Sequence, residues 1–296
     1  MKRNLFIFNS NLHKFILGLS CGIILILIFS ITINSIIKNS NFRLSRIFSE
    51  NKLLNYNIFY IGNSRAVSLN EVTLDNKKIF NASYNSLNYH EVENILYSLK
   101  EKNITRPTIY IELTSLIDDN LECRFSIFSN LIFYNKEKIL DKCKFELLLE
   151  KFLPISKVKN EIFLRTLYYA FYRNEDQKWQ NNYKMPKKTC LEGNLSPFAQ
   201  KIITNKSKNK MILRANEMIK KYYDFDLKFF IMPIFNKKEN YSLKLENEFL
   251  KNFDKSYIIS INNQIDKNFY KNCDLFADSL HLSNKGIKKI KFIISE

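Results

Sequence analysis

From about residue 56 onwards, short apolar runs alternate with amphipathic stretches. The runs are rich in β-branched and aromatic residues, as expected for strands buried on both faces of a parallel sheet, and cover residues 57–61, 78–81, 108–113, 227–232 and 257–261. The stretches between and after them have helical character at residues 89–102, 208–223, 239–252 and 283–294. This alternation predicts an α/β domain over residues 56–296, a three-layer sandwich with a mainly parallel sheet.

The N-terminal part of the chain has a different pattern. Residues 15–37 contain no charged side chain and are long enough to cross a hydrocarbon core as one helix. We therefore predict a transmembrane helix at 15–37, preceded by a cytoplasmic tail at 1–14 and followed by a juxtamembrane linker at 38–55. The predicted location is the inner or cytoplasmic membrane, with a single pass and the lipid bilayer as a partner.

A cleaved signal peptide is the alternative for this segment, because the basic residues Lys2, Arg3 and Lys14 precede it. The apolar stretch is longer than a usual signal-peptide core, however, and no A-x-A cleavage site follows it. Lys38 and Arg43 on the far side nearly balance the basic start, so the positive-inside rule does not decide the orientation.

Between residues 118 and 207 the alternation of strands and helices stops. We predict a largely helical insertion here, above the carboxyl edge of the sheet, where ligands bind in open α/β folds. Trp179, Tyr183 and Met185 could line a groove in this insertion. The simpler interpretation is that these side chains pack the insertion onto the domain.

Charge and composition exclude some partners. The formal net charge is +17, but the lysines are spread as singles and pairs rather than clustered, so we predict no nucleic-acid binding. A solvated basic surface is the expected result, with a weak attraction for acidic glycans or lipid head groups.

The five cysteines show no C-x-x-C spacing and no Cys/His cluster, so we predict no metal site and no cofactor. Cys21 lies in the apolar N-terminal segment. The other cysteines are even in number and can pair in an oxidising compartment, although the sequence does not show which would pair: Cys123, Cys143, Cys190 and Cys273.

A serine follows the first predicted strand, in the run Gly62-Asn63-Ser64. The glycine permits a tight turn, which places the serine hydroxyl at the carboxyl edge of the sheet, among the amides of a helix N-terminus. Those amides can stabilise an oxyanion. A serine in this position can also be a simple helix N-cap, so this motif alone is a weak signal.

A second chemical motif lies near the end of the chain, where Asp278 precedes His281 by three residues, directly before the last predicted helix. A serine hydroxyl needs a base at neutral pH, and the base needs a partner that fixes its tautomer. The chain has three histidines; His13 precedes the apolar segment and His90 falls in a predicted helix. His281 is therefore the expected base.

Together, G-x-S after the first strand and D-x-x-H-L-S-x-x-G before the last helix resemble the first and last blocks of the SGNH/GDSL hydrolase superfamily. With its N-terminal apolar helix, the chain is similar to the membrane-anchored branch of DltD-like and alginate-acetylation proteins. The resemblance implies a flavodoxin-like fold. It also implies that Ser64 is the nucleophile, His281 the general base and Asp278 its orienting partner.

The middle blocks of that family match less well. Residues 80–86 resemble an F-N-L-S-x-S-G segment, which would place Asn85 and Ser86 beside the oxyanion, together with the Ser64 amide. After the next strand the family has an asparagine, whereas this chain has Thr114 and Ser115 as its only nearby side-chain donors. Loss of one oxyanion donor typically slows an enzyme by about 10² to 10³.

The resemblance implies a membrane-anchored serine esterase or O-acyltransferase. Its substrates would be O-acyl groups, O-acetyl above all, on a cell-envelope glycan outside the cytoplasm. Transfer would require a membrane-bound acyl donor protein as a further partner. The alternative is a non-catalytic SGNH-like subunit that binds or assembles an envelope polymer; a basic envelope protein without a ligand is a third interpretation.

Overall fold

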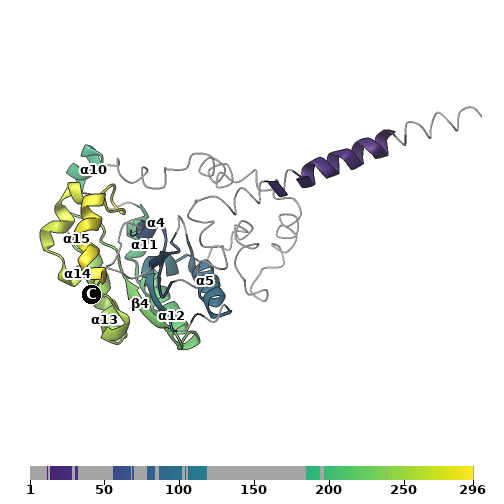
Figure 1. The fold of residues 1–296 in the computed structure, drawn as a ribbon. Coiled ribbons are helices and arrows are strands. Elements are labelled where there is room, and N and C mark those ends of the chain that lie inside the picture. The colour runs from purple at the N-terminus through teal and green to yellow at the C-terminus, as the bar shows by residue number, and fades with distance from the viewer. Residues whose placement is uncertain are drawn as a thin grey trace, which may run out of the picture.

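The fold is described from a computed structural model of the chain (Figure 1). The structure describes residues 12, 14–28, 31–32, 56–67, 69, 79–83, 87–101, 104, 106–118, 185–193, 197–237 and 239–295. Several residues singled out from the sequence lie outside these ranges: Asn85, Ser86, Cys123, Cys143, Trp179 and Tyr183. The predicted insertion is described only at its end.

The centre of the domain is a parallel sheet of four strands in the order β2-β1-β3-β4. Its strands are β1 (Ile58–Ile61), β2 (Ile79–Asn81), β3 (Thr108–Glu112) and β4 (Asp226–Phe230). Ile58 of β1 pairs with both Ile79 and Thr108, so the central strand is hydrogen-bonded on both sides. Because every pairing is parallel, the carboxyl ends of all four strands meet at one edge. The predicted α/β class is confirmed.

Helices fill the connections between and after these strands. The α-helices are α4 (Ser64–Val67), α5 (Tyr89–Glu101), α10 (Lys187–Glu192), α11 (Pro197–Ile202), α12 (Asn205–Lys221), α13 (Tyr241–Asn252), α14 (Ile261–Gln264) and α15 (Asn284–Ser295). The 3₁₀ turns are η2 (Leu113–Leu116), η6 (Lys255–Tyr257), η7 (Lys267–Lys271) and η8 (Cys273–Leu275). The long helices begin and end within a few residues of the predicted bounds, because their apolar faces follow the helical period.

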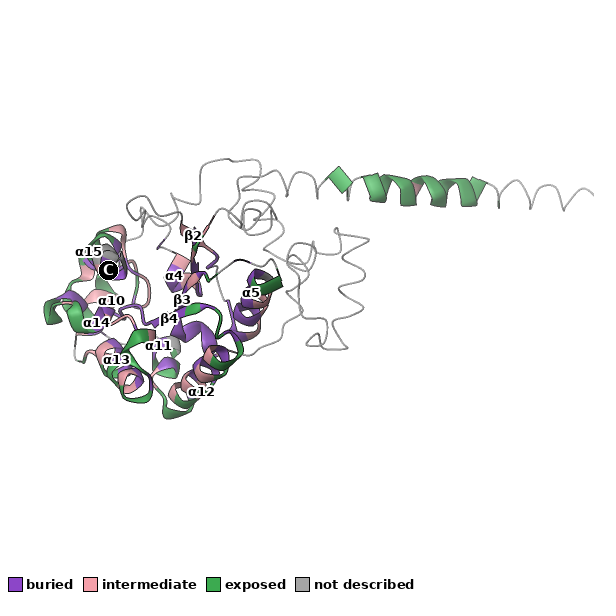
Figure 2. Ribbon diagram, turned by 60° about the horizontal axis from the view of Figure 1, so that its bottom comes forward, coloured by how far each residue is buried: buried purple, intermediate pink, exposed green. Residues whose placement is uncertain are grey.

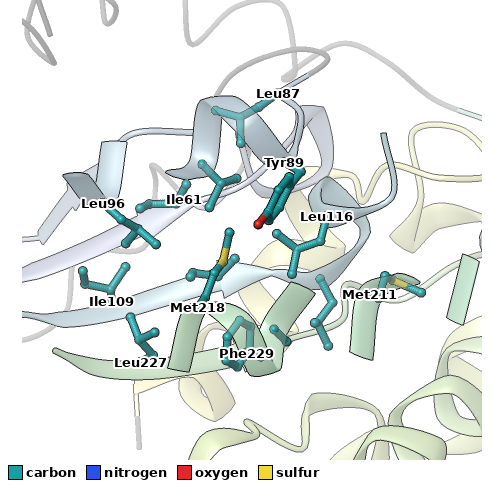
Figure 3. Close-up of a cluster of buried hydrophobic side chains, with 14 of the residues drawn as sticks. Ile61, Leu87, Tyr89, Leu96, Ile109, Leu116, Met211, Met218, Leu227 and Phe229 are labelled. Carbon is teal, nitrogen blue, oxygen red and sulfur yellow. The ribbon is translucent and has the colours of Figure 1, made fainter. Parts of the chain in front are cut away.

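The sheet has a hydrophobic core on each face. Phe59 and Ile61 of β1 pack into one core, with residues of α5 and α12 such as Leu96 and Met218 (Figure 3). Tyr60, between them, belongs to the other core, which residues of α15 cover. This alternation follows from the twofold period of strand side chains. Both faces of β1 are therefore buried from Phe59 to Ile61. In β3 and β4 one face is buried, whereas positions on the other face are half-buried or exposed until the buried carboxyl ends of the strands (Figure 2).

The predicted fifth strand at 257–261 is wrong in extent. Ile258 makes a single parallel bridge to Phe229, and the Ile259 amide donates to the Phe229 carbonyl at 2.8 Å. Beyond this point the backbone amides of Asn262 and Asn263 donate to the buried carboxylate of Glu246, at 2.9 Å each. These bonds start α14, and the chain leaves the sheet after one bridge.

Residues 14–28 are helical and lie apart from the sheet domain in Figure 1. Large apolar side chains along them are exposed, for example Phe15, Leu17 and Leu25. None of the helices among the described residues combines the length and apolar character that crossing a membrane requires. Residues 33–37 lie outside the described part, so a transmembrane helix at 15–37 stays a prediction.

The glycine of the H-L-S-x-x-G motif explains how α15 packs on η8. A Cβ atom on Gly286 would lie 2.1 Å from the Leu275 carbonyl oxygen and 3.1 Å from Leu282 Cδ2. Because the first of these is a backbone atom, it cannot move aside cheaply.

We expect Gly286→Ala to lower the free energy of unfolding by about 1–3 kcal/mol, as overpacking does. Urea unfolding followed by circular dichroism measures this change. Lys288→Ala, an exposed position on the same helix, is the control and should change stability by less than about 0.5 kcal/mol. Equal midpoints for the two variants would contradict the close packing at Gly286.

Candidate active site

Ser64 lies at the carboxyl edge of the sheet, at the first residue of α4. Strand β1 ends at Ile61, and Gly62 makes the turn. A Cβ atom at Gly62 would lie 2.6 Å from the Ala66 Cβ and 2.7 Å from the Glu112 Cβ. Only glycine lets the chain turn this close to β3, and the turn leaves the Ser64 side chain half-buried.

Asp278 and His281 belong to one tight turn before α15. Phe276 and Leu282 form an antiparallel bridge that closes the turn, and the Ala277 amide donates to the His281 carbonyl at 2.8 Å. Within the turn, Asp278 Oδ1 accepts from the Leu280 amide at 2.7 Å and from the His281 amide at 2.8 Å. The carboxylate is thus held by the backbone on one oxygen, which leaves Oδ2 for the imidazole.

The turn and the serine meet through the imidazole of His281. Its Nδ1 lies 2.7 Å from Asp278 Oδ2, and its Nε2 lies 2.8 Å from Ser64 Oγ. An ionised carboxylate only accepts, so Nδ1 donates to Asp278 and Nε2 accepts from the Ser64 hydroxyl. The structure therefore brings together the three residues singled out from the sequence, in an arrangement that suits a nucleophile, a base and its orienting group.

Opposing effects act on the pKa of Asp278. Burial raises it, but the hydrogen bond from His281 and the electrostatic interaction with that residue, with the backbone amides of Leu280 and His281, outweigh burial. The net result is a pKa below the ordinary aspartate value. Asp278 is therefore a carboxylate at neutral and mildly acidic pH, which is the form that can accept from Nδ1.

A buried polar cluster surrounds the turn that carries Ser64. Arg65 and Glu112 form an ion pair at 3.1 Å, and both side chains are at most 1% exposed. Asn63 Nδ2 donates to Thr114 Oγ1 at 2.9 Å, and Thr114 Oγ1 donates in turn to Glu112 Oε2 at 2.5 Å. No pattern in the sequence indicated this cluster.

The two side chains considered as replacements for the missing oxyanion donor are already engaged. The Thr114 hydroxyl donates to Glu112, and the Ser115 hydroxyl donates to the Glu112 carbonyl at 2.6 Å. Each hydroxyl has one hydrogen, so neither has one left for an oxyanion in this arrangement. In this arrangement Thr114 therefore has no hydrogen to donate to an oxyanion, which was its predicted role, and its hydroxyl instead donates to the Glu112 carboxylate.

The loop after β2 lies next to the serine turn. Asn81 Nδ2 donates to the Ala66 carbonyl of α4 at 3.1 Å, and Asn81 Oδ1 accepts from the Ser83 amide at 2.8 Å. Asn81 therefore ties the start of this loop to the segment that follows Ser64. The predicted oxyanion donors Asn85 and Ser86 come next in the chain and lie outside the described residues.

A disulfide joins Cys190 of α10 to Cys273 of η8, across 83 residues of sequence, with the two Cα atoms 5.8 Å apart. It ties the end of the insertion to the turn that precedes Asp278. Met185, close to Cys190 in the chain, is buried in the α15 core, so the packing interpretation holds for this residue.

Other sites are not evident in the described residues. They contain no group of three or more His, Cys, Asp or Glu side chains that could hold a metal ion. A cavity of about 320 Å³ lies between η7 and α15, lined by Asp266, Phe269 and Lys289 among others. None of Ser64, Asp278 and His281 lines it.

Comparisons with known proteins add little to this geometry. No protein-family model matches the chain, and no curated protein matches it. A solved structure from Streptococcus pneumonia, provisionally named a platelet activating factor, is similar over 88% of this chain and 93% of its own. The identity is 11% and the TM-score 0.42, values too low to identify a family. The candidate site therefore depends on its own geometry.

The disulfide leads to a prediction about stability. A crosslink that closes a loop of 83 residues restricts the unfolded chain, by roughly 4 kcal/mol in the chain-entropy model. We expect Cys190→Ser/Cys273→Ser to lower the free energy of unfolding by a comparable amount, measured as a lower urea midpoint. Cys21→Ser, at an exposed free thiol, is the control and should not change the midpoint. An unchanged midpoint in the double variant would contradict a structural role for the crosslink.

The lowered pKa of Asp278 predicts how stability depends on pH. The folded-state pKa lies below the unfolded-state value, so the ionised group stabilises the fold above the unfolded pKa, and this contribution is lost as pH falls through the folded pKa. The difference in unfolding free energy between the wild type and Asp278→Asn should thus be larger near about pH 7 than near about pH 3. Urea unfolding at both pH values measures it, and a pH-independent difference would contradict the pKa shift.

Proposed function

We propose that the protein is a serine esterase or O-acyltransferase that uses Ser64, His281 and Asp278. The observation that carries this proposal is the position of the His281 imidazole, hydrogen-bonded to Asp278 at 2.7 Å and to Ser64 at 2.8 Å. A binding site needs no such relay, whereas activation of a hydroxyl nucleophile needs each part of it.

The reaction begins when Ser64 Oγ attacks the carbonyl carbon of an ester and its proton passes to His281 Nε2. Asp278 stabilises the resulting imidazolium through Nδ1. The tetrahedral intermediate collapses, the carbon–oxygen bond to the leaving alcohol breaks, and Nε2 returns the proton to that alcohol oxygen. The acyl group is now esterified to Ser64.

In the second half, His281 Nε2 takes a proton from an acceptor hydroxyl, whose oxygen attacks the acyl carbon. The second tetrahedral intermediate collapses, the bond between the acyl carbon and Ser64 Oγ breaks, and Nε2 returns the proton to Ser64 Oγ. Water as the acceptor gives hydrolysis, and a sugar hydroxyl gives transfer. The oxyanion of both tetrahedral intermediates would be held by backbone amides, that of Ser64 and those of the loop containing Asn85 and Ser86.

Three features favour a substrate in the cell envelope. The Cys190–Cys273 disulfide suits an oxidising compartment outside the cytoplasm. The exposed apolar side chains of residues 14–28 suit an anchor in the membrane. The net charge of +17 suits an acidic polymer or surface. We therefore propose O-acyl, mainly O-acetyl, groups of an envelope glycan as the substrate, with a membrane-bound acyl donor protein as the partner for transfer.

One observation favours the second candidate, a non-catalytic binding or assembly subunit. The hydroxyls of Thr114 and Ser115 are engaged with Glu112, so side-chain support for an oxyanion is reduced at this position. The two candidates differ in whether Ser64 forms an acyl-enzyme.

A fluorophosphonate probe on the purified protein tests this difference, together with hydrolysis of 4-nitrophenyl acetate. We expect the probe to label wild-type Ser64 and to leave Ser64→Ala unlabelled. His281→Ala should lose at least about 10³-fold in rate, because the hydroxyl then keeps its proton, and Asp278→Asn up to about 10⁴-fold through a misoriented imidazole.

Ser256→Ala, a serine on the exposed surface, is the matched control and should react as the wild type does. Each variant should keep its circular dichroism spectrum. A wild-type protein whose Ser64 is not labelled, or a Ser64→Ala variant that hydrolyses the ester at the wild-type rate, would overturn the enzyme proposal in favour of the binding subunit.

A further inference from the structure

We propose that Arg65 is a positioning residue, which sets the distance between Ser64 and His281 by holding the ends of three strands together. This inference rests on the proposed function, because it assigns Arg65 a role in the same site. Arg65 directly follows the nucleophile in the chain, yet its side chain is 1% exposed and turns away from solvent into the domain.

The guanidinium contacts two neighbouring strand ends besides its own. Nη1 donates to Glu112 Oε1, at the end of β3, at 3.1 Å. Nη2 donates to the carbonyl oxygen of Met232 and, at 3.5 Å, to that of Pro233, both in the segment after β4. One planar group thus joins the carboxyl ends of β1, β3 and β4 at the edge where the serine lies.

The segment after β4 also contacts the turn that contains His281. The Phe235 amide donates to the carbonyl of Ser279, which lies between Asp278 and His281, at 3.1 Å. The Phe235 ring packs edge-on against Phe276, at the start of the same turn, with 5.4 Å between ring centroids. Arg65 is therefore linked to the nucleophile through the chain, and to the base through the segment from Met232 to Phe235.

Asn63 and Thr114 complete the connection on the side of the serine. Asn63 Oδ1 accepts from the Arg65 amide at 3.1 Å, and Arg65 Nη1 also donates to Thr114 Oγ1 at 3.3 Å. The residues on both sides of Ser64 are thus fixed to the end of β3, so the serine hydroxyl has little freedom to move relative to His281.

The chemistry of the pair favours positioning over stability as its role. A buried ion pair can usually be replaced by well-packed apolar residues with little loss of stability, because desolvation offsets much of the attraction. Arginine presents several donors in a rigid plane, so it can reach a carboxylate and two carbonyl groups at once, which lysine cannot. A displacement of about 1 Å between reacting groups can cost about 10²-fold in rate.

The experiment compares Arg65→Met/Glu112→Leu with the wild type. The double substitution removes both charges, so neither is left buried without a partner. We expect a folded protein in which kcat for 4-nitrophenyl acetate and the rate of fluorophosphonate labelling fall about 10²-fold, while KM changes less than about threefold. The NMR signal of the His281 Nδ1 proton should persist, since the Asp278–His281 turn stays intact.

Arg65→Lys is the second variant, because it keeps the charge next to Glu112 but cannot span all of these acceptors. It should lose about 10-fold in kcat and gives the decisive measurement if the double variant fails to fold. Lys221→Met/Glu93→Leu is the control: this ion pair between α12 and α5 is 2.9 Å long, with the Glu93 side chain 5% and the Lys221 side chain 40% exposed. It should keep the wild-type kcat.

The positioning role is overturned if the folded Arg65→Met/Glu112→Leu protein, or Arg65→Lys in its place, keeps kcat within about twofold of the wild type. It is equally overturned if the Lys221→Met/Glu93→Leu control loses as much kcat, since loss of an ion pair elsewhere in the domain would then have the same effect. Failure of the proposed function is distinguishable, because the wild-type protein itself would then show no labelling of Ser64.

Discussion

The hydrogen bond between His281 Nε2 and Ser64 Oγ joins two segments that are 217 residues apart, and the proposed chemistry depends on it. Both segments reach the same place because the sheet is parallel. Its strand ends share one edge, and the first strand delivers Ser64 there while the turn before α15 delivers His281. Each face of the sheet has its own hydrophobic core, so the positions of these ends are set by packing from both sides.

Much of this arrangement could be predicted from local sequence. The bounds of α5 and α13 follow from the helical period of their apolar residues, and β1 and β3 from short buried runs. The Asp278–His281 turn could also be predicted, because its spacing is short and its hydrogen bonds stay within the turn. Such features depend on neighbours in the chain, which a sequence displays directly.

Features that depend on several distant segments could not be predicted. Charged residues are rarely buried, and nothing next to Arg65 or Glu112 in the chain indicates that these two pair. Four cysteines allow three pairings, so the sequence left Cys190–Cys273 as one choice among several. The run at 257–261 has strand composition, but the Glu246 carboxylate, contributed by α13, redirects its backbone into α14.

The exposure of the base bears on the choice between hydrolysis and transfer. The His281 side chain is 33% exposed and that of Asp278 51%, so solvent reaches the imidazole. Water can therefore take the place of the acceptor whenever this surface is open. Transfer requires an acceptor that covers the imidazole, excludes water and presents its own hydroxyl to Nε2. Because Ser64, His281 and Asp278 would act in the same way in both proposed reactions, the outcome would depend on what covers the exposed part of His281.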